Sequence, residues 1–368
     1  MRIAFILNNL SGGGAERVAV NVANNLAQLG NDVSLVLNYK RGPYIGDVSP
    51  NVTILSLEKR MLFALPRLVG VLRREKFDAV LSVLDQPSMA CLLVKPLVSH
   101  TKFIVIECNN PLASNDGVRS FIWKLIRKLR PLLYPKADHI ITKSEGIRSA
   151  LLKHFNCKSN RVTAIANPVD TARIDRLALE EVNHPWFSSK VSAPVIVAMG
   201  RLSIQKGFDN LINAFTILRK ERNLRLLILG EGSERSHLEA LVRKLNVTAD
   251  VDLHGFSTNP YAYVARANCF VLSSRWEGWP NALVEALACG TSSVATDWES
   301  GPSEILSHGT YGSLVPPENV LALASAIKDT LDSPKSSHEL RAHVLQFSPR
   351  IVAQKYLSVI EGAIANGH

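Results

Sequence analysis

Residues 273–290 read Ser-Ser-Arg-Trp-Glu-Gly-Trp-Pro-Asn-Ala-Leu-Val-Glu-Ala-Leu-Ala-Cys-Gly. The apolar residues 268–272 that precede them predict a strand, and Asn281 is a residue type that often caps the start of a helix. The glycine that closes the stretch predicts the end of that helix. Glu277 is therefore expected in the loop at the carboxyl end of the strand, and Glu285 in the first turn of the helix. Both carboxylates would then face one crevice.

This arrangement suits a ligand that carries both hydroxyl and phosphate groups. The exposed backbone N–H groups after Asn281 form an anion site at the helix start, and the carboxylates of Glu277 and Glu285 can accept hydrogen bonds from hydroxyls. A nucleotide sugar presents both kinds of group. The simpler alternative is an acidic loop followed by a helix with a glutamate near its N-terminus, where the helix dipole favours it.

Length and composition indicate a globular protein of about two domains. Of the 368 residues, 46% are apolar and 20% are charged. The apolar segment 89–98 is interrupted by Lys95 and Pro96 and falls short of the roughly 18 residues that a membrane span needs. Residues 1–7 have too short an apolar core for a signal peptide. We therefore expect a soluble protein whose synthesis ends in the cytoplasm.

The net charge restricts the kinds of partner, and the cysteine pattern restricts the kinds of structural site. A net charge of +10 predicts an anionic partner, either nucleic acid, a phosphorylated small molecule or an acidic membrane surface, and does not choose among them. The five cysteines are odd in number and lack a Cys-x-x-Cys spacing. This pattern argues against a disulfide framework and against a structural zinc site.

Strand and helix patterns alternate along the chain, which predicts doubly wound parallel sheets. The strand at 2–8 leads into a glycine loop at 10–17 and an amphipathic helix, so Gly13 and Gly14 would let a phosphate or sugar approach the backbone closely. A dinucleotide fingerprint would need a third glycine where this chain has Arg17, so a nicotinamide or flavin site is disfavoured. A purely structural turn is the alternative.

Polar residues follow the strands predicted at 79–84 and 103–107. These residues lie at the carboxyl ends of the strands, where open α/β sheets bind ligands. They are Asp85 after the first strand, and Glu107, Cys108 and Asn109 after the second. We expect them on the side of a second substrate. The alternatives are a helix cap for Asp85 and a turn before proline for the asparagine.

The polar, charged segment 171–192 predicts a linker between two α/β domains, at 1–170 and 193–346. In the second domain, Arg201 and Lys206 follow a strand and precede a helix. They predict a diphosphate clamp, because Arg binds two oxygens through its planar fork and Lys acts as a point charge. Two solvated basic residues in a loop are the alternative. Further small or aromatic residues follow neighbouring strands, namely Gly200, Gly230, Gly232 and Phe256.

Together these motifs resemble glycosyltransferase family 4, retaining enzymes of the GT-B fold. The resemblance covers nearly the whole chain. It implies two doubly wound, Rossmann-like domains that face a central cleft, and a C-terminal segment at 347–368 whose helix crosses back to the first domain. It is carried by Gly200-Arg201-Leu202 with Lys206-Gly207, Gly230-Glu231-Gly232, the spacing Glu277-x7-Glu285, Gly12-Gly13-Gly14-Ala15-Glu16 and the hinge Asn167-Pro168-Val169-Asp170.

The resemblance also implies a role for each site residue. Arg201 and Lys206 would hold the diphosphate of the donor, Glu285 its ribose and Glu277 the transferred sugar. Backbone at Asn281, Ala282 and Leu283 would hold the distal phosphate, with further donor contacts from Gly13, Gly14, Gly200, Gly230, Gly232 and Phe256. The acceptor side would include Glu16, Asp85, Glu107, Cys108 and Asn109. Relatives often carry His or Arg where this chain has Cys108.

The expected reaction needs no metal ion. When the bond between the anomeric carbon and the diphosphate breaks, fixed cations facing the diphosphate stabilise its growing charge. The first domain shows no Asp-x-Asp spacing next to a strand end, so no metal and no other cofactor is expected. The resemblance implies attack and departure on the same face of the sugar, with the leaving phosphate taking the acceptor proton. A sugar-nucleotide 2-epimerase and a non-catalytic nucleotide-sugar sensor are the alternatives.

Two basic amphipathic segments, at 59–76 and 118–136, suggest where the acceptor comes from. A basic helix with an apolar stripe suits an anionic membrane surface. We therefore expect peripheral binding at the inner face of the cytoplasmic membrane, a lipid-linked saccharide acceptor and no nucleic acid. The expected donor is a UDP-sugar, such as UDP-GalNAc, UDP-GlcNAc or UDP-glucose, with GDP-mannose as second choice. Ordinary helices with solvated basic faces are the alternative.

Overall fold

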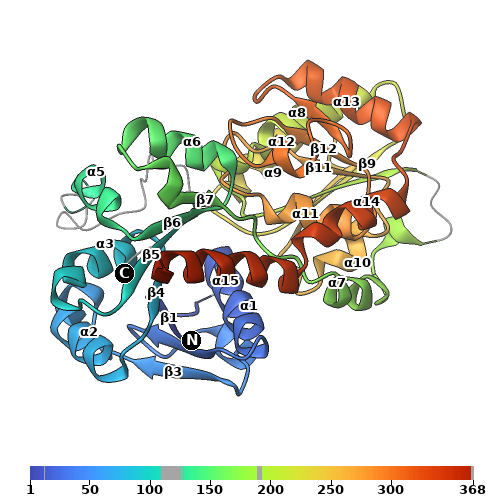
Figure 1. Cartoon of the computed structure of the whole chain (residues 1–368). Helices are drawn as coiled ribbons and strands as arrows, with labels where there is room; N and C mark the ends of the chain where they lie inside the picture. The colour runs from blue at the N-terminus through green and yellow to red at the C-terminus, as the bar shows by residue number, and fades with distance from the viewer. Residues whose placement is uncertain (12, 109–125, 127, 189–192, 366–368) are drawn as a thin grey trace. The chain divides into compact units, whose positions relative to one another are not determined.

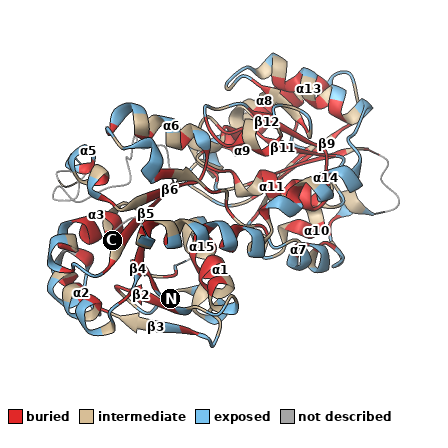
Figure 2. Cartoon of the chain, in the orientation of Figure 1, coloured by how far each residue is buried: buried red, intermediate tan, exposed pale blue. Residues whose placement is uncertain are grey.

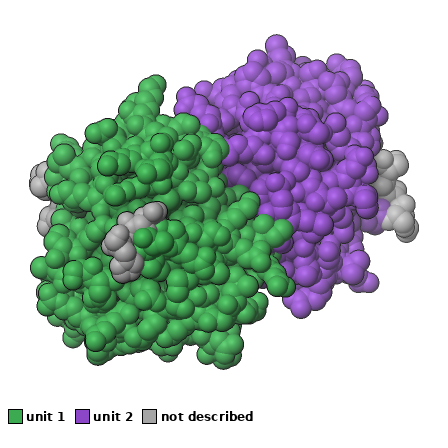
Figure 3. Space-filling model, in the orientation of Figure 1, with its two compact units in different colours: residues 1–168, 349–368 green, residues 169–348 purple. Residues whose placement is uncertain are grey.

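The alternating strands and helices form two parallel sheets, one in each of two structural units. The computed structural model describes residues 1–11, 13–108, 126, 128–188 and 193–365. Unit 1 consists of Met1–Pro168 with Pro349–His368, and unit 2 of Val169–Ser348 (Figure 3). The predicted fold class, two doubly wound parallel-sheet domains, is confirmed.

The sheet of unit 1 has seven strands in the order β3-β2-β1-β4-β5-β6-β7, all parallel to their neighbours. At its centre, Phe5 pairs with Leu35 on one side and with Leu81 on the other. The central strands read as nearly continuous apolar runs because helices cover both faces. Their bounds are β1 Arg2–Leu7, β2 Asp32–Leu37, β3 Val52–Ser56, β4 Ala79–Val83, β5 Lys102–Glu107, β6 His139–Thr142 and β7 Val162–Ala164.

Helices pack on both faces of this sheet. On one face, α1 (Gly14–Gln28) buries Val18, Val22 and Leu26, and α15 (Pro349–Ala365) lies beside it (Figure 1). On the other face lie α2 (Met61–Glu75) and α3 (Asp85–Val94). The remaining elements are short, apart from α6: α5 Arg130–Leu133, α6 Glu145–His154, η1 Pro43–Asp47, η2 Lys95–Leu97, η3 Tyr134–Lys136 and η4 Ser159–Arg161.

The sheet of unit 2 has six parallel strands in the order β10-β9-β8-β11-β12-β13. Helices α8 (Phe208–Arg219), α9 (Arg235–Lys244) and α13 (Val320–Asp332) pack on one face. The central strands are buried in both units, while the helices expose one side (Figure 2). The strand bounds are β8 Val195–Met199, β9 Arg225–Leu229, β10 Val251–Gly255, β11 Cys269–Leu272, β12 Ser293–Thr296 and β13 Ser313–Val315.

The remaining helices of unit 2 include some that the sequence pattern did not predict. The described part of the segment expected to be a linker contains α7 (Thr171–Ala178) and η5 (Pro185–Phe187) and belongs to unit 2. The helix begins because the side chain of Asp170 accepts the Arg173 N–H, 3.0 Å away. Its exposed face is charged, which made it resemble a linker. The others are α10 Pro260–Val264, α11 Asn281–Ala288, α12 Pro302–Ile305, α14 Ser337–Val344, η6 Ile204–Lys206 and η7 Leu345–Phe347.

Within the described part of the chain, none of the helices combines the length and the apolar character needed to cross a membrane.

Candidate functional site

The carboxyl edge of the unit 2 sheet continues as a ladder of backbone hydrogen bonds beyond the strands. The Gly200 N–H donates to the Leu229 carbonyl (2.9 Å), and the Gly230 N–H donates to the Gly255 carbonyl (2.7 Å). Gly230 has a φ of +147°, and a Cβ there would collide with the Gly200 carbonyl. The glycines predicted from the sequence therefore line one edge, and glycine is required where two loops cross at backbone distance.

Lys206 and Glu277, predicted to bind different parts of a donor, lie in contact. The Lys206 Nζ donates to the Glu277 Oε1 at 2.5 Å. The lysine side chain reaches this position by passing over Gly200, where an added Cβ would lie 3.1 Å from Lys206 Cε. The Ser273 hydroxyl also donates to the Lys206 carbonyl (2.9 Å). The loop after β8 is therefore fastened to the loop after β11, with a cation and a carboxylate side by side.

Glu277 is held at several points. Its side chain is 8% exposed, and the Ser274 hydroxyl donates to its Oε1 at 2.7 Å. The Ser300 hydroxyl donates to its backbone carbonyl at 2.9 Å. Sequence reasoning missed both serines. Ser274 lies within the sequence motif at 273–290 but has no distinctive spacing, and Ser300 comes from the loop after β12.

Arg201 contrasts with Lys206. It is exposed, and its guanidinium forms no hydrogen bond or ion pair with any residue in the described ranges. Arg275, to which the sequence assigned no role, instead forms ion pairs with Asp209 (2.7 Å) and Glu318 (3.0 Å). Burial alone would raise the pKa of Asp209, but hydrogen bonds from Arg275 lower it below its ordinary value. Arg275 thus anchors the loop to the start of α8.

The start of α11 differs from the prediction. Pro280, with extended backbone, is the cap, and no side chain caps the helix. Asn281 is its first residue, so the prediction that Asn281 caps the helix was wrong, and Glu285 lies in the second turn. The Leu283 N–H donates to the Pro280 carbonyl (3.0 Å). An anion at this helix start would therefore meet the backbone of Asn281 and Ala282.

Glu285 remains on the same edge as Glu277. It is half-buried, and the hydroxyl of Tyr261 on α10 donates to its Oε1 at 3.2 Å. The sequence offered no signal for Tyr261, since it precedes Glu285 by 24 residues. Phe256, just after β10, is 76% exposed and offers an apolar surface at the same edge.

In unit 1, the glycine loop leads directly into α1. Gly13 is the extended cap, and Gly14 is the first, exposed residue of the helix. The Glu16 carboxylate folds back on the loop, so that a Cβ at Gly13 would collide with it. The predicted acceptor-side glutamate therefore lies against the predicted glycine loop.

Asp85 and Glu107, predicted on the acceptor side, share one buried counter-ion. Arg130 forms an ion pair with Asp85 (3.2 Å) and a second with Glu107. The Tyr134 hydroxyl also donates to Glu107 (2.8 Å). Burial and the Glu107 charge raise the pKa of Tyr134 well above its ordinary value. Arg130 is 3% exposed, so the prediction that it lies on the exposed basic face of the segment 118–136 was wrong. Two carboxylates at adjacent strand ends require a cation between them.

Cys108 lies beside a buried lysine that the sequence did not single out. Lys143, just after β6, is 2% exposed and donates to the hydroxyl of Tyr356 on α15. Burial raises the pKa of Cys108 to about 11, although the nearby Lys143 charge acts in the opposite direction. Lys143 thus supplies a positive charge close to Cys108, where the sequence resemblance led us to expect His or Arg. Asn109 lies outside the described residues.

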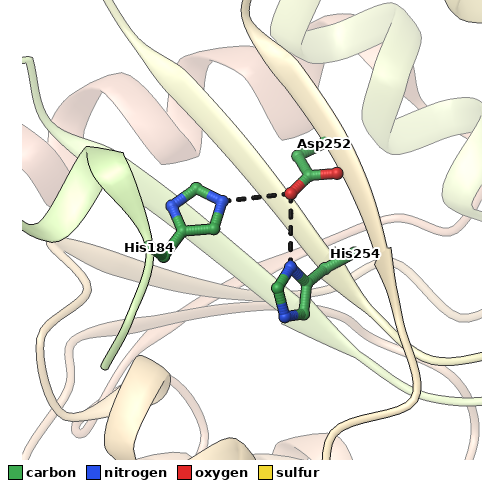
Figure 4. Close-up of side chains that lie close together, drawn as sticks. All are labelled: His184, Asp252 and His254. Carbon is green, nitrogen blue, oxygen red and sulfur yellow. Dashed lines mark hydrogen bonds and ion pairs between the residues drawn. The ribbon is translucent and has the colours of Figure 1, made fainter. Parts of the chain in front are cut away.

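Among the described residues, one group has the composition of a metal site: His184, Asp252 and His254 (Figure 4). Asp252 Oδ2 lies 3.0 Å from His184 Nε2 and 3.3 Å from His254 Nδ1. The Trp186 N–H donates to His184 Nδ1 (3.2 Å), so the His184 proton is on Nε2 and faces Asp252. Hydrogen bonds therefore account for the cluster, which fastens the start of η5 to β10.

Two family models match the chain, one in each half. Residues 12–173 match the model described as Glycosyltransferase Family 4. Residues 182–345 match the model described as Glycosyl transferases group 1.

Curated relatives and solved structures agree with these matches. Over 345 residues, covering 91% of both proteins, the chain is 28% identical to the Campylobacter jejuni N-acetylgalactosamine-N,N'-diacetylbacillosaminyl-diphospho-undecaprenol 4-alpha-N-acetylgalactosaminyltransferase. It is 26% identical over 358 residues to the GalNAc-alpha-(1->4)-GalNAc-alpha-(1->3)-diNAcBac-PP-undecaprenol alpha-1,4-N-acetyl-D-galactosaminyltransferase of the same organism, covering 92% of this chain and 91% of that one. The crystal structure of Anabaena HepE in complex with UDP superimposes with a TM-score of 0.80 at 18% identity, covering 98% and 100% of the two chains, and shows the same fold.

Proposed function

The chain belongs to glycosyltransferase family 4, and from this membership we propose that it is a retaining, metal-independent enzyme that transfers a sugar from a nucleotide-sugar donor to a lipid-linked glycan. The reaction would serve the assembly of a cell-surface polysaccharide or glycoconjugate. We favour a UDP-sugar, with UDP-GalNAc first, and place GDP-mannose second. The names of two relatives specify N-acetylgalactosamine transfer, and HepE was solved with UDP, which supports this order.

The observation that carries the proposal is the contact between Lys206 Nζ and Glu277 Oε1, 2.5 Å apart at the carboxyl edge of the unit 2 sheet. In a nucleotide sugar, the diphosphate is bonded directly to the transferred sugar. A cation for the diphosphate and a carboxylate for a sugar hydroxyl must therefore be neighbours. Exposed Arg201 offers a second cation, and Glu285 offers a carboxylate for the ribose.

The proposed chemistry follows from these groups. Arg201 and Lys206 would stabilise the charge that grows on the diphosphate as the anomeric bond breaks. The leaving phosphate would take the proton of the acceptor hydroxyl on the same face of the sugar, so no protein base is required. Glu277 would hold the transferred sugar in orientation.

The names of both Campylobacter relatives include an undecaprenyl diphosphate, and on this basis we propose a polyprenyl diphosphate-linked acceptor. Binding at the inner face of the cytoplasmic membrane would bring the enzyme to it. Two exposed apolar side chains of unit 1, Phe63 and Leu97, support such binding because each lies next to an exposed arginine. Phe63 is 68% exposed and precedes Arg67 by one turn of α2. The Leu97 carbonyl accepts a hydrogen bond from Arg73. Apolar groups next to cations suit an anionic lipid surface.

The enzymatic test is incubation of the purified protein with UDP-GalNAc and an undecaprenyl diphosphate-linked saccharide, with EDTA present. We expect a product heavier by one HexNAc, with an α-linkage seen by NMR. A β-linkage would contradict retention, and dependence on an added divalent ion would contradict the metal-independent mechanism. Formation of an epimer from donor alone would favour the epimerase, and donor binding without any turnover would favour the sensor.

Membrane binding is tested separately by cosedimentation with liposomes. We expect binding that requires anionic lipid and weakens with salt over the Debye range. The variant Phe63→Ser should bind more weakly. Leu321→Ser is the matched control, since Leu321 is 72% exposed on α13 of unit 2 and should leave binding unchanged. Equal binding to neutral and anionic vesicles would contradict the membrane proposal and leave the transferase proposal standing.

A further inference from the structure

The carboxylate of Glu277 is held through one of its two oxygens. The Lys206 ammonium and the Ser274 hydroxyl both donate to Oε1, at 2.5 and 2.7 Å. The other oxygen, Oε2, accepts no hydrogen bond from the residues that the structure describes. Because two donors converge on one oxygen, the orientation of the carboxylate is set.

Of the two donors, Ser274 is the one with a fixed position. A lysine ammonium sits on a flexible four-carbon stem and can follow either oxygen of a rotating carboxylate. Ser274 is 1% exposed, and its carbonyl accepts from the Thr296 hydroxyl at the end of β12. Its hydroxyl therefore projects from backbone that is anchored to the sheet.

We propose that Ser274 is a positioning residue, which turns Glu277 so that Oε1 faces Lys206 and Oε2 faces the donor sugar. Lys206 then uses one N–H for Oε1 and keeps two for the diphosphate. Ser274 does not touch the substrate and acts through Glu277. This inference rests on the proposed function, since it assigns Oε2 to a hydroxyl of the transferred sugar.

If Ser274 had only a structural role, its removal would affect the affinities for UDP and for the UDP-sugar differently from what the positioning role predicts. A hydroxyl that only satisfies a buried oxygen would affect folding and would change the binding of UDP and of the UDP-sugar alike. A positioning role affects only the ligand that carries a sugar. The ratio of the two affinities therefore separates the two roles, whatever happens to stability.

The experiment compares Ser274→Ala with wild type, using UDP and the UDP-sugar that wild type turns over. Loss of a hydrogen bond to a charged group lowers an affinity or a kcat/KM by roughly 10- to 100-fold. We expect kcat/KM and UDP-sugar affinity to fall by that factor, while UDP affinity stays within about twofold. Ser274→Thr keeps the hydroxyl and should restore most of the loss. Ser300→Ala is the matched control, because Ser300 binds the Glu277 backbone and not its carboxylate; it should leave the ratio unchanged.

Equal loss of UDP and UDP-sugar affinity in Ser274→Ala, or no loss of either, would overturn the inference. So would a change of the same size in Ser300→Ala. If the wild-type protein turns over no nucleotide sugar, both the proposed function and the positioning role of Ser274 fail. If wild type transfers sugar and the affinity ratio of Ser274→Ala is normal, only the positioning role fails.

Discussion

Lys206→Ala should cost both activity and stability, whereas Arg201→Ala should cost activity alone. From sequence alone, the two substitutions are expected to behave alike, with kcat reduced roughly 100-fold and stability almost unchanged. The structure separates them. Lys206 is the ion-pair partner of a carboxylate that is 8% exposed, and its removal leaves that charge with the Ser274 hydroxyl as its remaining donor. Arg201 is exposed.

The loss of stability expected for Lys206→Ala follows from the burial of Glu277. Leaving a buried polar or charged group without a partner costs about 1–3 kcal/mol or more. For a domain of this size, each kcal/mol lowers Tm by roughly 2–4 °C. Lys206→Ala should therefore lower Tm by roughly 2–12 °C, while Arg201→Ala should stay within about 0.5 kcal/mol of wild type, as is usual for surface substitutions.

Thermal unfolding and steady-state kinetics of both variants test this reasoning. The double variant Lys206→Ala/Glu277→Gln is the decisive control, because it removes the unpaired charge. It should recover most of the lost Tm while remaining inactive. A Lys206→Ala protein with wild-type Tm, or a double variant no more stable than the single one, would show that the ion pair is not buried as the structure has it.

Three further predictions concern other groups. Glu285→Gln should weaken free UDP binding, whereas Glu277→Gln should leave UDP affinity alone and lower kcat; equal losses in isothermal titration would refute this division of roles. Arg130→Met should destabilise the protein by about 3–5 kcal/mol, since it removes the buried cation that pairs with both Asp85 and Glu107, whereas Arg74→Met, at a side chain 67% exposed, should barely shift the urea midpoint. Since burial raises the pKa of Cys108 to about 11, only ~0.1% of its side chains should be thiolate at pH 8. In the folded protein, the rate of iodoacetamide labelling of Cys108, measured by peptide mass, should therefore rise steeply up to about pH 11. In urea, the rate should level off near the ordinary pKa of a thiol.

The comparison of sequence and structure is clearest at the elements that the pattern missed. β3 is a half-exposed edge strand and β13 has only three residues, so neither produces the continuous apolar run of a central strand. The helix α7 has a charged outer face and two buried residues, Ile174 and Ala178. Its fold depends on what it packs against, which local sequence does not report.

By itself, the sequence determined the two parallel sheets, the family and the edge on which the candidate site lies, because buried strands, glycine turns and polar strand ends follow a local pattern. Only the tertiary structure decided which side chains are partners. Lys206 donates a hydrogen bond to Glu277, which is 71 residues away in the sequence, and Lys143 donates one to Tyr356, which is 213 residues away. Arg130, in a basic stretch that predicted an exposed, membrane-binding helix face, is instead buried in ion pairs with Asp85 and Glu107. A buried charge takes the counter-ion that the packed strands bring within reach, and the order of residues along the chain does not specify which one that is.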